Sequence, residues 1–430
     1  MTKVASLNKK PTFTKYQVFV IAILAILQFT VVLDFMVLSP LSDMLIKKLS
    51  ITSAQFTLVV SAYGISAGIS GLLAAGFADK FDRKKLLLFF YAGFILGTLF
   101  CGVAPDYNSL MAARIVTGVF GGVLSSISFA IITDLFEMQV RGRVMGFVQM
   151  AFAVSQVLGI PAGLYLANKF GWHIPFLMIV AFSVIVFTII LVKLKPVAEH
   201  LKLKGQSNPV KHLVKTISNK RYITGFLGTV LLATGGFMLM PLGAAFSINN
   251  LKITNEQLPV VYLITGIFSM IFGPIIGKLS DSIGKFRMFA IGSILTMVMV
   301  FVYTNLAATP LWMVIILNVL LFVGVTSRMI SASALMSGVP APQDRGSFMG
   351  INSSIQYLSG GMASFIAGSL TFQNKEGVFQ HYERIGYVVI ASMVVCAIMM
   401  WFINRMVNRS GLENPQKAFV KEVNKKELAE

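Results

Sequence analysis

Charged residues are scarce in this sequence. Only 12% of its 430 residues are Asp, Glu, Lys or Arg, whereas 56% are hydrophobic. A soluble domain cannot bury that much apolar surface, so the composition excludes a soluble globular protein and indicates a chain that lies mostly in lipid. Cysteine is rarer still, since only Cys101 and Cys396 occur, in apolar runs of different halves of the chain. We expect free thiols, no disulfide framework and no metal site.

Histidine is also rare, and the motifs of several enzyme classes are missing. The four histidines, His173, His200, His212 and His381, lie in loops or at the ends of apolar runs. Neither an H-E-x-x-H motif nor a pair of aspartates at membrane depth occurs, which argues against an intramembrane enzyme. A phosphate-binding glycine-rich loop ending in G-K-S or G-K-T is absent, so ATP does not drive this protein. We therefore expect neither catalysis nor a cofactor.

Long apolar runs dominate what is present. A helix of roughly 20 residues crosses a hydrocarbon core of about 30 Å, and the sequence contains twelve apolar runs of that length. The first run follows several lysines but is too long for a signal peptide and lacks a cleavage pattern, so we expect it to be retained. The approximate centres of the twelve runs are Leu27, Gly68, Phe94, Gly121, Gln156, Val184, Ala233, Met270, Leu295, Val323, Leu358 and Val395. The pattern predicts an all-α membrane protein with twelve transmembrane helices.

The positive charges predict the orientation of the chain. Of the 36 Lys and Arg residues, 28 fall on one predicted face of the membrane and six on the other. Cytoplasmic loops carry the excess of Lys and Arg, so we expect both termini in the cytoplasm and the protein in the cytoplasmic (inner) membrane, as a multi-pass chain. The net charge of +19 is then mostly a topology signal, and we expect no nucleic acid as a partner.

The sequence divides into two halves that repeat. We expect six-helix bundles at residues 1–195 and 221–430, joined by a polar, basic cytoplasmic linker at 196–220. "RGRVMG" at 141–146 recurs as "RGSFMG" at 345–350, and "AGFADKFDRKK" at 75–85 recurs as "GKLSDSIGKFR" at 277–287. The two motif pairs share nearly the same offset, which indicates a duplication. Duplicated six-helix units are typical of secondary transporters that work by alternating access.

These motifs also carry a family resemblance. The pattern G-x-x-x-D-x-x-G-(R/K)-x-(R/K) resembles the loop signature of the major facilitator superfamily, and "GKLSDSIGKFR" fits it throughout. The first copy departs at both glycines, where Ala75 and Asp82 stand. "LGIPAGLYLANKFGWHIPF" at 158–176 resembles the fifth span of the bacterial drug:proton antiporter branch, which has arabinose-efflux-like members. The resemblance implies two pseudo-symmetric six-helix bundles and alternating access.

The loop motifs predict a latch on the cytoplasmic side. The resemblance implies that Asp79 accepts from the free N–H groups at the start of the eleventh span, and by symmetry Asp281 would dock near the start of "RGRVMG". Asp134 and Glu137, at the end of the fourth span, are the candidate partners of Arg83. Alternatively, the basic residues only enforce topology. The expected gating residues are Asp79, Arg83, Asp134, Arg141, Asp281, Lys285, Arg345 and Gly346.

Glycines four residues apart predict where helices approach closely. Such pairs occur on the second, fifth, eighth and eleventh spans: Gly64 and Gly68, Gly159 and Gly163, Gly273 and Gly277, Gly346 and Gly350. Glycine is common in membrane helices generally, so the spacing alone does not identify a moving surface.

Two charges within the apolar runs point to coupling chemistry. In "VVLDFMVLSP", Asp34 lies about seven residues before the end of the first span, and Arg114 lies at nearly the same depth in the fourth. An ionised carboxylate in hydrocarbon must be paired, hydrated or protonated. Two interpretations stay open: a static ion pair that fixes helix packing, or a titrating pair. The pattern D-x-x-x-x-x-P at 34–40 also resembles a motif of drug:proton antiporters, whose acid takes part in proton coupling.

Arg328 is a second isolated charge, about midway along the tenth span, where transporter binding sites gather. We expect it to face Asp34 across the cavity or to bind an anionic group of the substrate; the alternative is an arginine that reaches the cytoplasmic edge. Other polar and flexible apolar residues are candidate cavity liners, or ordinary packing contacts. The candidate substrate cavity consists of Asp34, Phe35, Met36, Gln156, Phe237, Met238, Asn318, Arg328, Asn352, Gln356 and Tyr357.

The sequence thus favours a proton-coupled secondary transporter that exports a small organic molecule or drug in exchange for H⁺. Its expected partners are that molecule, protons and membrane lipids, and we expect a monomer. A proton-coupled importer of a small, possibly anionic, solute is the first alternative, because alternating access is reversible. An intramembrane enzyme is a remote second alternative.

Overall fold

The computed structural model describes residues 13–74, 80–198, 201, 214–341, 344–374 and 376–409. Their first half contains five unbroken long helices and a sixth span built from shorter pieces. The unbroken helices are α1 (Lys15–Val37), α3 (Ser53–Ala74), α4 (Arg83–Gly102), α5 (Tyr107–Leu135) and α9 (Ile174–Lys193). The composite span contains α6 (Met138–Gln149), α7 (Ala151–Val154), the π-helical turn η2 (Ser155–Gly159) and α8 (Ile160–Phe170).

The second half contains six long helices. They are α11 (Lys220–Phe237), α13 (Leu258–Ile283), α14 (Lys285–Thr304), α15 (Leu311–Met336), α16 (Arg345–Leu370) and α17 (Tyr382–Arg409). The short helices α2 (Ser42–Lys48) and α12 (Gly243–Asn249) follow the first long helix of each half. The antiparallel strands β1 (Phe372–Gln373) and β2 (Phe379–Gln380) pair with Phe372 opposite Gln380.

The helices bear out the predicted all-α fold. Each of the twelve predicted centres lies in one of the twelve long segments, and ten helices in the described part of the chain are long and apolar enough to cross a membrane. The two long helices below that limit are α11 and α16. α16 is polar because it packs along α3 of the other half, so its serines, Asn352 and Gln356 meet protein rather than lipid.

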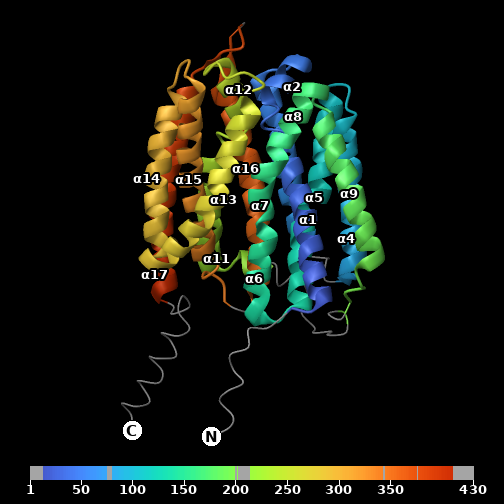
Figure 1. The fold of residues 1–430 in the computed structure, drawn as a ribbon. Coiled ribbons are helices and arrows are strands. Elements are labelled where there is room, and N and C mark those ends of the chain that lie inside the picture. The colour runs from blue at the N-terminus through green and yellow to red at the C-terminus, as the bar shows by residue number, and fades with distance from the viewer. Residues whose placement is uncertain are drawn as a thin grey trace.

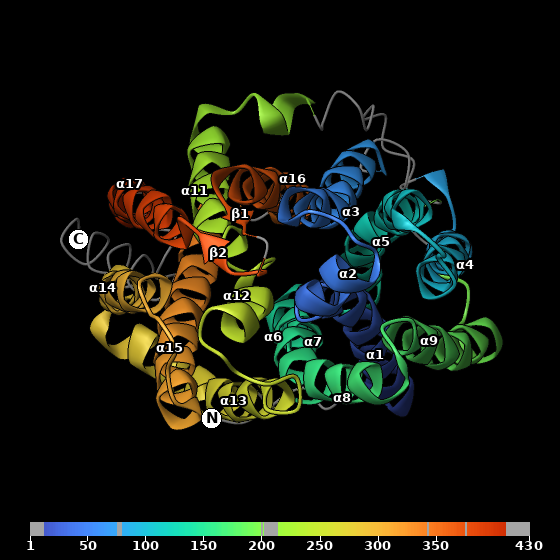
Figure 2. The same cartoon turned by 90° about the horizontal axis from the view of Figure 1, so that it is seen from above.

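We call the side where α1 begins and α17 ends the terminal face, and the opposite side, which carries α2 and α12, the distal face (Figure 1). Seen from above, the helices form two groups, α1 to α9 and α11 to α17, which meet where α3 lies beside α16 and where α8 lies beside α13 (Figure 2).

The hydrophobic core shows where the two halves are joined. Towards the distal face one core contains residues of both halves, among them Val37 and Leu41 with Met238, Leu242 and Phe246. Towards the terminal face there are two cores, one built from α1, α3, α4, α5, α6 and α9 and the other from α11, α14, α15, α16 and α17, with Leu72 of α3 packed against the second. The halves are therefore packed together on the distal side and kept apart on the terminal side, except along α3 and α16.

Glycines explain the close approach of α3 and α16. A Cβ on Gly64 would lie 2.9 Å from the Cα of Gly361, and a Cβ on Gly68 would lie 2.9 Å from the backbone nitrogen of Leu358. The hydroxyl of Ser61 also donates to the carbonyl of Gly361. The glycine pattern thus predicted this contact on the second span.

The same pattern was wrong for the eighth span. Apart from the adjacent residues and backbone of α13 itself, no atom of the described residues lies within 4 Å of a Cβ placed on Gly273 or Gly277. α13 approaches the first half through Gly266 instead, where a Cβ would lie 2.9 Å from the Cα of Val157 in the π-helical turn. Two glycines at the right spacing do not say which side of the helix faces a neighbour.

Candidate functional site

Asp34 and Arg114 form a buried ion pair. Nη1 of Arg114 lies 2.8 Å from Oδ2 of Asp34, and both side chains are fully buried. The hydroxyl of Thr98, on α4, donates to Oδ1 of Asp34 over 3.2 Å. The carboxylate is therefore held by α4 and α5 although it lies on α1, and the structure brings together the two charges whose similar depth the sequence indicated.

The arginine has spare hydrogen-bonding capacity. Its Nε and Nη2 atoms are buried and have no hydrogen-bond partner among the described residues. The guanidinium carbon lies 4.4 Å from the ring centroid of Tyr63 on α3, a distance at which the ring face attracts a cation. Because breaking a buried ion pair leaves an uncompensated charge, the pair holds α1 and α5 together as long as both partners stay ionised.

An aromatic cluster lies directly beside this pair, at the junction of the two halves. It contains Phe35, Tyr63, Phe237 and Tyr357, which come from α1, α3, α11 and α16. The ring centroid of Phe35 lies 5.4 Å from that of Tyr63, 5.6 Å from that of Phe237 and 5.9 Å from that of Tyr357. The Tyr63 and Tyr357 centroids are 6.3 Å apart. Tyr63 therefore contacts both the cluster and Arg114.

The flexible side chains of Met36 and Met240 pack against the aromatic cluster. The sequence pointed to Phe35, Met36, Phe237 and Tyr357 as cavity residues, and the structure brings them together. It did not point to Tyr63. The available signal was a large tyrosine within the small-residue stretch "SAYGISAGISG" at 61–71, directly before Gly64.

The remaining candidate liners are dispersed. Asn352 accepts from Thr229 over 2.6 Å, which links α16 to α11 within one half, and Asn318 donates to Val314 O in its own helix. Gln156 and Gln356 are half-buried. Met238 is fully buried in the distal core, so it packs there instead of lining a cavity.

Arg328 lies elsewhere than expected. It is buried, and its guanidinium carbon lies 5.6 Å from the ring centroid of Phe289 on α14. Its burial also rules out the alternative of an arginine that reaches the aqueous edge. The side chain therefore points into the second half, away from Asp34, and its Nε and Nη2 atoms have no hydrogen-bond partner among the described residues.

The expected terminal latch is formed only in part. Arg83 Nε lies 3.2 Å from Asp134 Oδ2, which joins α4 to α5 within the first half. Arg141 donates to the carbonyls of Phe136 and Thr133 at the end of α5. Asp79 lies outside the described residues.

Of the contacts expected between the halves, the one between Asp281 and Arg141 is not formed in the described part of the chain. Asp281 is exposed and makes no ion pair or hydrogen bond with Arg141 in the described part of the chain. Lys285 lies at the start of α14, and Arg345 and Gly346 lie at the start of α16. The separated terminal cores explain this, because Asp281 can reach α6 only when that side closes.

Polar contacts close the distal side instead, and the sequence did not point to them. Ala245 N donates to Ser42 Oγ over 3.0 Å, and Asn249 Nδ2 donates to Asp43 Oδ1 over 2.6 Å. We call these four residues the distal gate. Asp43 also forms an ion pair of 2.8 Å with Lys47. Because the gate joins α2 to α12, it links the two halves.

The buried ion pair and the aromatic cluster beside it define the candidate site. No group of three or more His, Cys, Asp or Glu residues in that part of the chain could bind a metal ion. The chemically distinctive elements are a carboxylate that is isolated from water and a wall of aromatic rings next to it.

Comparison with known proteins identifies the family. The family model of the Major Facilitator Superfamily matches residues 24–364 and 225–428. The uncharacterized MFS-type transporter YceJ of Bacillus subtilis is 26% identical over 62% of this chain and 68% of its own length. Multidrug resistance protein 2 of Bacillus subtilis is 24% identical over 62% of this chain and 68% of its own length.

A solved structure has the same fold. A bacterial homologue of the human lysosomal transporter Spinster, in an inward-facing and unoccupied conformation, superposes with a TM-score of 0.73. It is 15% identical, and the match covers 93% of this chain and 99% of that one. The family match spans both halves, and the helices are arranged as in this structure. The chain therefore belongs to the Major Facilitator Superfamily and is a multi-pass membrane transporter.

Proposed function

We propose that this protein is a proton-coupled secondary transporter of the drug:proton antiporter branch, which exports a small organic molecule in exchange for H⁺. It acts in the cytoplasmic membrane with its terminal face in the cytoplasm, as a monomer, and needs no cofactor besides the proton gradient. Residues 1–195 and 221–430 would form its two moving bundles, with 196–220 as the linker.

The observation that supports this proposal most is the buried Asp34–Arg114 ion pair behind Tyr63. A proton that reaches Asp34 neutralises the carboxylate and removes its attraction to Arg114. Among the described residues, the guanidinium then keeps the backbone carbonyl of Asp34, at 3.4 Å from Nη1, and the face of Tyr63 as partners. Because Tyr63 belongs to the aromatic cluster, protonation of Asp34 would alter the shape of that cluster through the ring of Tyr63.

The substrate would bind from the terminal side against the aromatic cluster. Rings and methionines offer an adaptable apolar surface that suits planar, lipophilic molecules. The name of the Bacillus subtilis multidrug resistance relative agrees with this. The importer of an anionic solute loses its support, because Arg328 lies against Phe289 and not beside the aromatic cluster.

The test is proton movement in proteoliposomes that contain a pH-sensitive dye. Lipophilic cations, neutral drugs, nucleosides, sugars and organic anions are added in turn to wild type, to Asp34→Asn and to Asp34→Asn/Arg114→Gln. We expect a substrate-triggered proton signal of antiport sign in wild type, absent from both variants. Substrate exchange without a gradient should survive in the double variant, which lacks the unpaired arginine.

Two outcomes would contradict the proposal. A normal proton signal in the double variant would remove Asp34 and Arg114 from coupling and leave them as packing residues. A signal of symport sign would replace export by import.

A further inference from the structure

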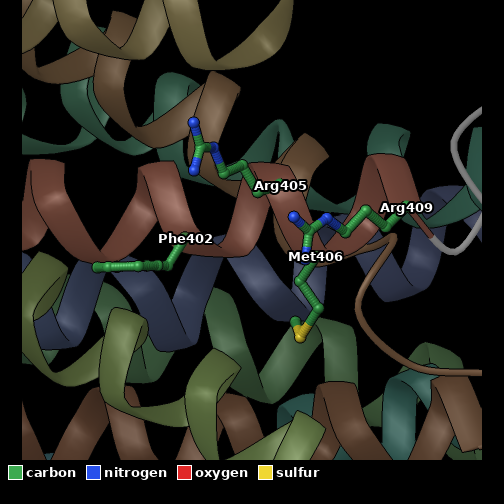
Figure 3. Close-up of a pocket in the computed structure, with 4 residues that line it drawn as sticks. All are labelled: Phe402, Arg405, Met406 and Arg409. Carbon is green, nitrogen blue, oxygen red and sulfur yellow. The ribbon is translucent and has the colours of Figure 1, made fainter.

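A pocket of about 460 Å³ lies along the end of α17 at the terminal face. Phe402, Arg405, Met406 and Arg409 line it (Figure 3). Residues four apart lie on the same side of a helix, about 6 Å apart along its axis. Arg405 and Arg409 therefore form one row and Phe402 and Met406 another, so that two cations lie beside an apolar strip.

An interfacial tryptophan holds one of these cations in place. The guanidinium carbon of Arg405 lies 3.7 Å from the ring centroid of Trp401, and that ring packs edge-on against Phe402. Stacking uses the flat face of the guanidinium and leaves its N–H groups, which lie in the plane, free to donate to an anion. Tryptophan is enriched at the level of the lipid headgroups, so this end of α17 lies where phosphates are found.

No acidic residue compensates these charges in the described part of the chain. Neither Arg405 nor Arg409 takes part in any of the ion pairs there, which involve Asp34, Asp43, Asp134 and Glu383. A helix C-terminus favours a cation at Arg409, in its last turn, and the excess of positive charge predicted for the terminal face favours cations at both positions. Two arginines one helical turn apart on the same side of α17 offer N–H donors that a phosphate between them can accept from.

The position of the pocket indicates whether the phosphate belongs to a lipid or to the transported molecule. α17 lies at the rim of the molecule, where it contacts α11, α14, α15 and α16 of its own half (Figure 2). The side chain of Phe402 is 53% exposed. The pocket thus faces the bilayer and not the aromatic cluster, so its occupant is a lipid and not the transported molecule.

We propose that Arg405 and Arg409 bind the phosphate headgroup of an anionic phospholipid in the leaflet at the terminal face, with an acyl chain along Phe402 and Met406. The site anchors the second half to anionic lipid and takes no part in the proton chemistry of Asp34. Basic pockets on transmembrane helices are a known means of selecting anionic lipids.

Native mass spectrometry of the full-length protein tests this, with phosphatidylglycerol and phosphatidylcholine as the two probes. We expect wild type to bind phosphatidylglycerol in preference, and Arg405→Gln/Arg409→Gln to weaken that binding about 30-fold, or about fivefold for each guanidinium removed. Phosphatidylcholine binding should not change. Lys278→Gln/Arg287→Gln is the matched control, because it removes two exposed charges at the same face on α13 and α14.

Unchanged phosphatidylglycerol binding in the Arg405/Arg409 variant would overturn the proposal. An equal loss in the control would also overturn it, since it would indicate attraction to the overall positive charge. The single variant Arg409→Gln, at the exposed end of the helix, gives the same test with a fivefold loss if the double variant does not fold. Lipid binding is measured without transport, so the result is independent of the proposed function.

Discussion

At the scale of single residues, the Asp34–Arg114 pair is the feature whose stability depends most on both partners being present. Both side chains are fully buried, and a charge without its partner has neither water nor a second counter-ion there. Removing one partner is therefore expected to lower the stability of the folded protein more than removing both, because amides or apolar groups can replace a complete pair.

We predict that Arg114→Gln lowers the stability of the folded protein by about 3–5 kcal/mol, the usual cost of leaving one buried charge unpaired. Asp34→Asn/Arg114→Gln should recover most of that loss. Thermal unfolding in detergent at neutral pH measures both. A double variant as unstable as Arg114→Gln would mean that the arginine acts through Tyr63 and not through Asp34.

The proximity of Asp34 and Arg114 was predictable because depth in the membrane follows from counting residues. The direction of Arg328 was not. The polar residues of the tenth span, such as Asn318, Ser327 and Ser331, are spread around the helix, so its sequence does not say which side faces the centre of the molecule. Tyr63 was missed for a related reason, since its contact with Arg114 depends on how α3 packs against α5.

At the scale of elements, helix contacts depend on a few backbone positions. α3 and α16 touch through Gly64, Gly68 and Gly361, and side chains there would force the helices apart.

The start of α4 is stabilised by a side-chain cap. Asp82, one of the two departures from the family signature, accepts from the N–H groups of Lys84 and Lys85.

The second copy of the motif begins its helix by other means. Gly284 precedes α14 with φ of 102°, a conformation that side chains disfavour. The sequence predicted the number and place of the long helices because twenty-residue apolar runs are an unambiguous signal. It did not predict the π-helical turn at 155–159, which depends on packing against α1 and α13.

We predict that Gly64→Ala destabilises the protein by about 1–3 kcal/mol and slows transport, because its Cβ would meet backbone atoms of α16 that cannot give way. Gly273→Ala serves as the control, since it also places alanine in a helix but meets no atom within 4 Å. It should be neutral or slightly stabilising. Thermal unfolding of the two variants side by side decides the matter. Equal melting temperatures would argue against a tight α3–α16 contact.

At the scale of the whole molecule, the two faces differ in how the halves are held. A shared hydrophobic core and the distal gate join them on one side, whereas the terminal cores are separate. Opening the distal side requires breaking the bond between Asp43 and Asn249 and exposing the shared core. The gate therefore contributes to the preference for the conformation described here.

We predict that Asp43→Ala shifts the population towards a conformation that is open at the distal face. Spin labels at Lys48→Cys and Lys252→Cys should move apart, and labels at Gln149→Cys and Lys278→Cys should move closer. Lys47→Ala is the control, because it removes the ion pair within α2, whose lysine side chain is 56% exposed, and leaves the bond between Asp43 and Asn249 across the halves in place. Distance distributions that match wild type in Asp43→Ala would exclude a gating role.

The aromatic cluster has a consequence for how such a protein can change over generations. Its four rings come from four helices, two in each half, and only Tyr63 also contacts Arg114. Replacement of Phe35, Phe237 or Tyr357 alters the aromatic cluster without removing a partner of the ion pair. Under the proposed function, selection can therefore change the range of accepted compounds one ring at a time, while Asp34 and Arg114 are inherited unchanged.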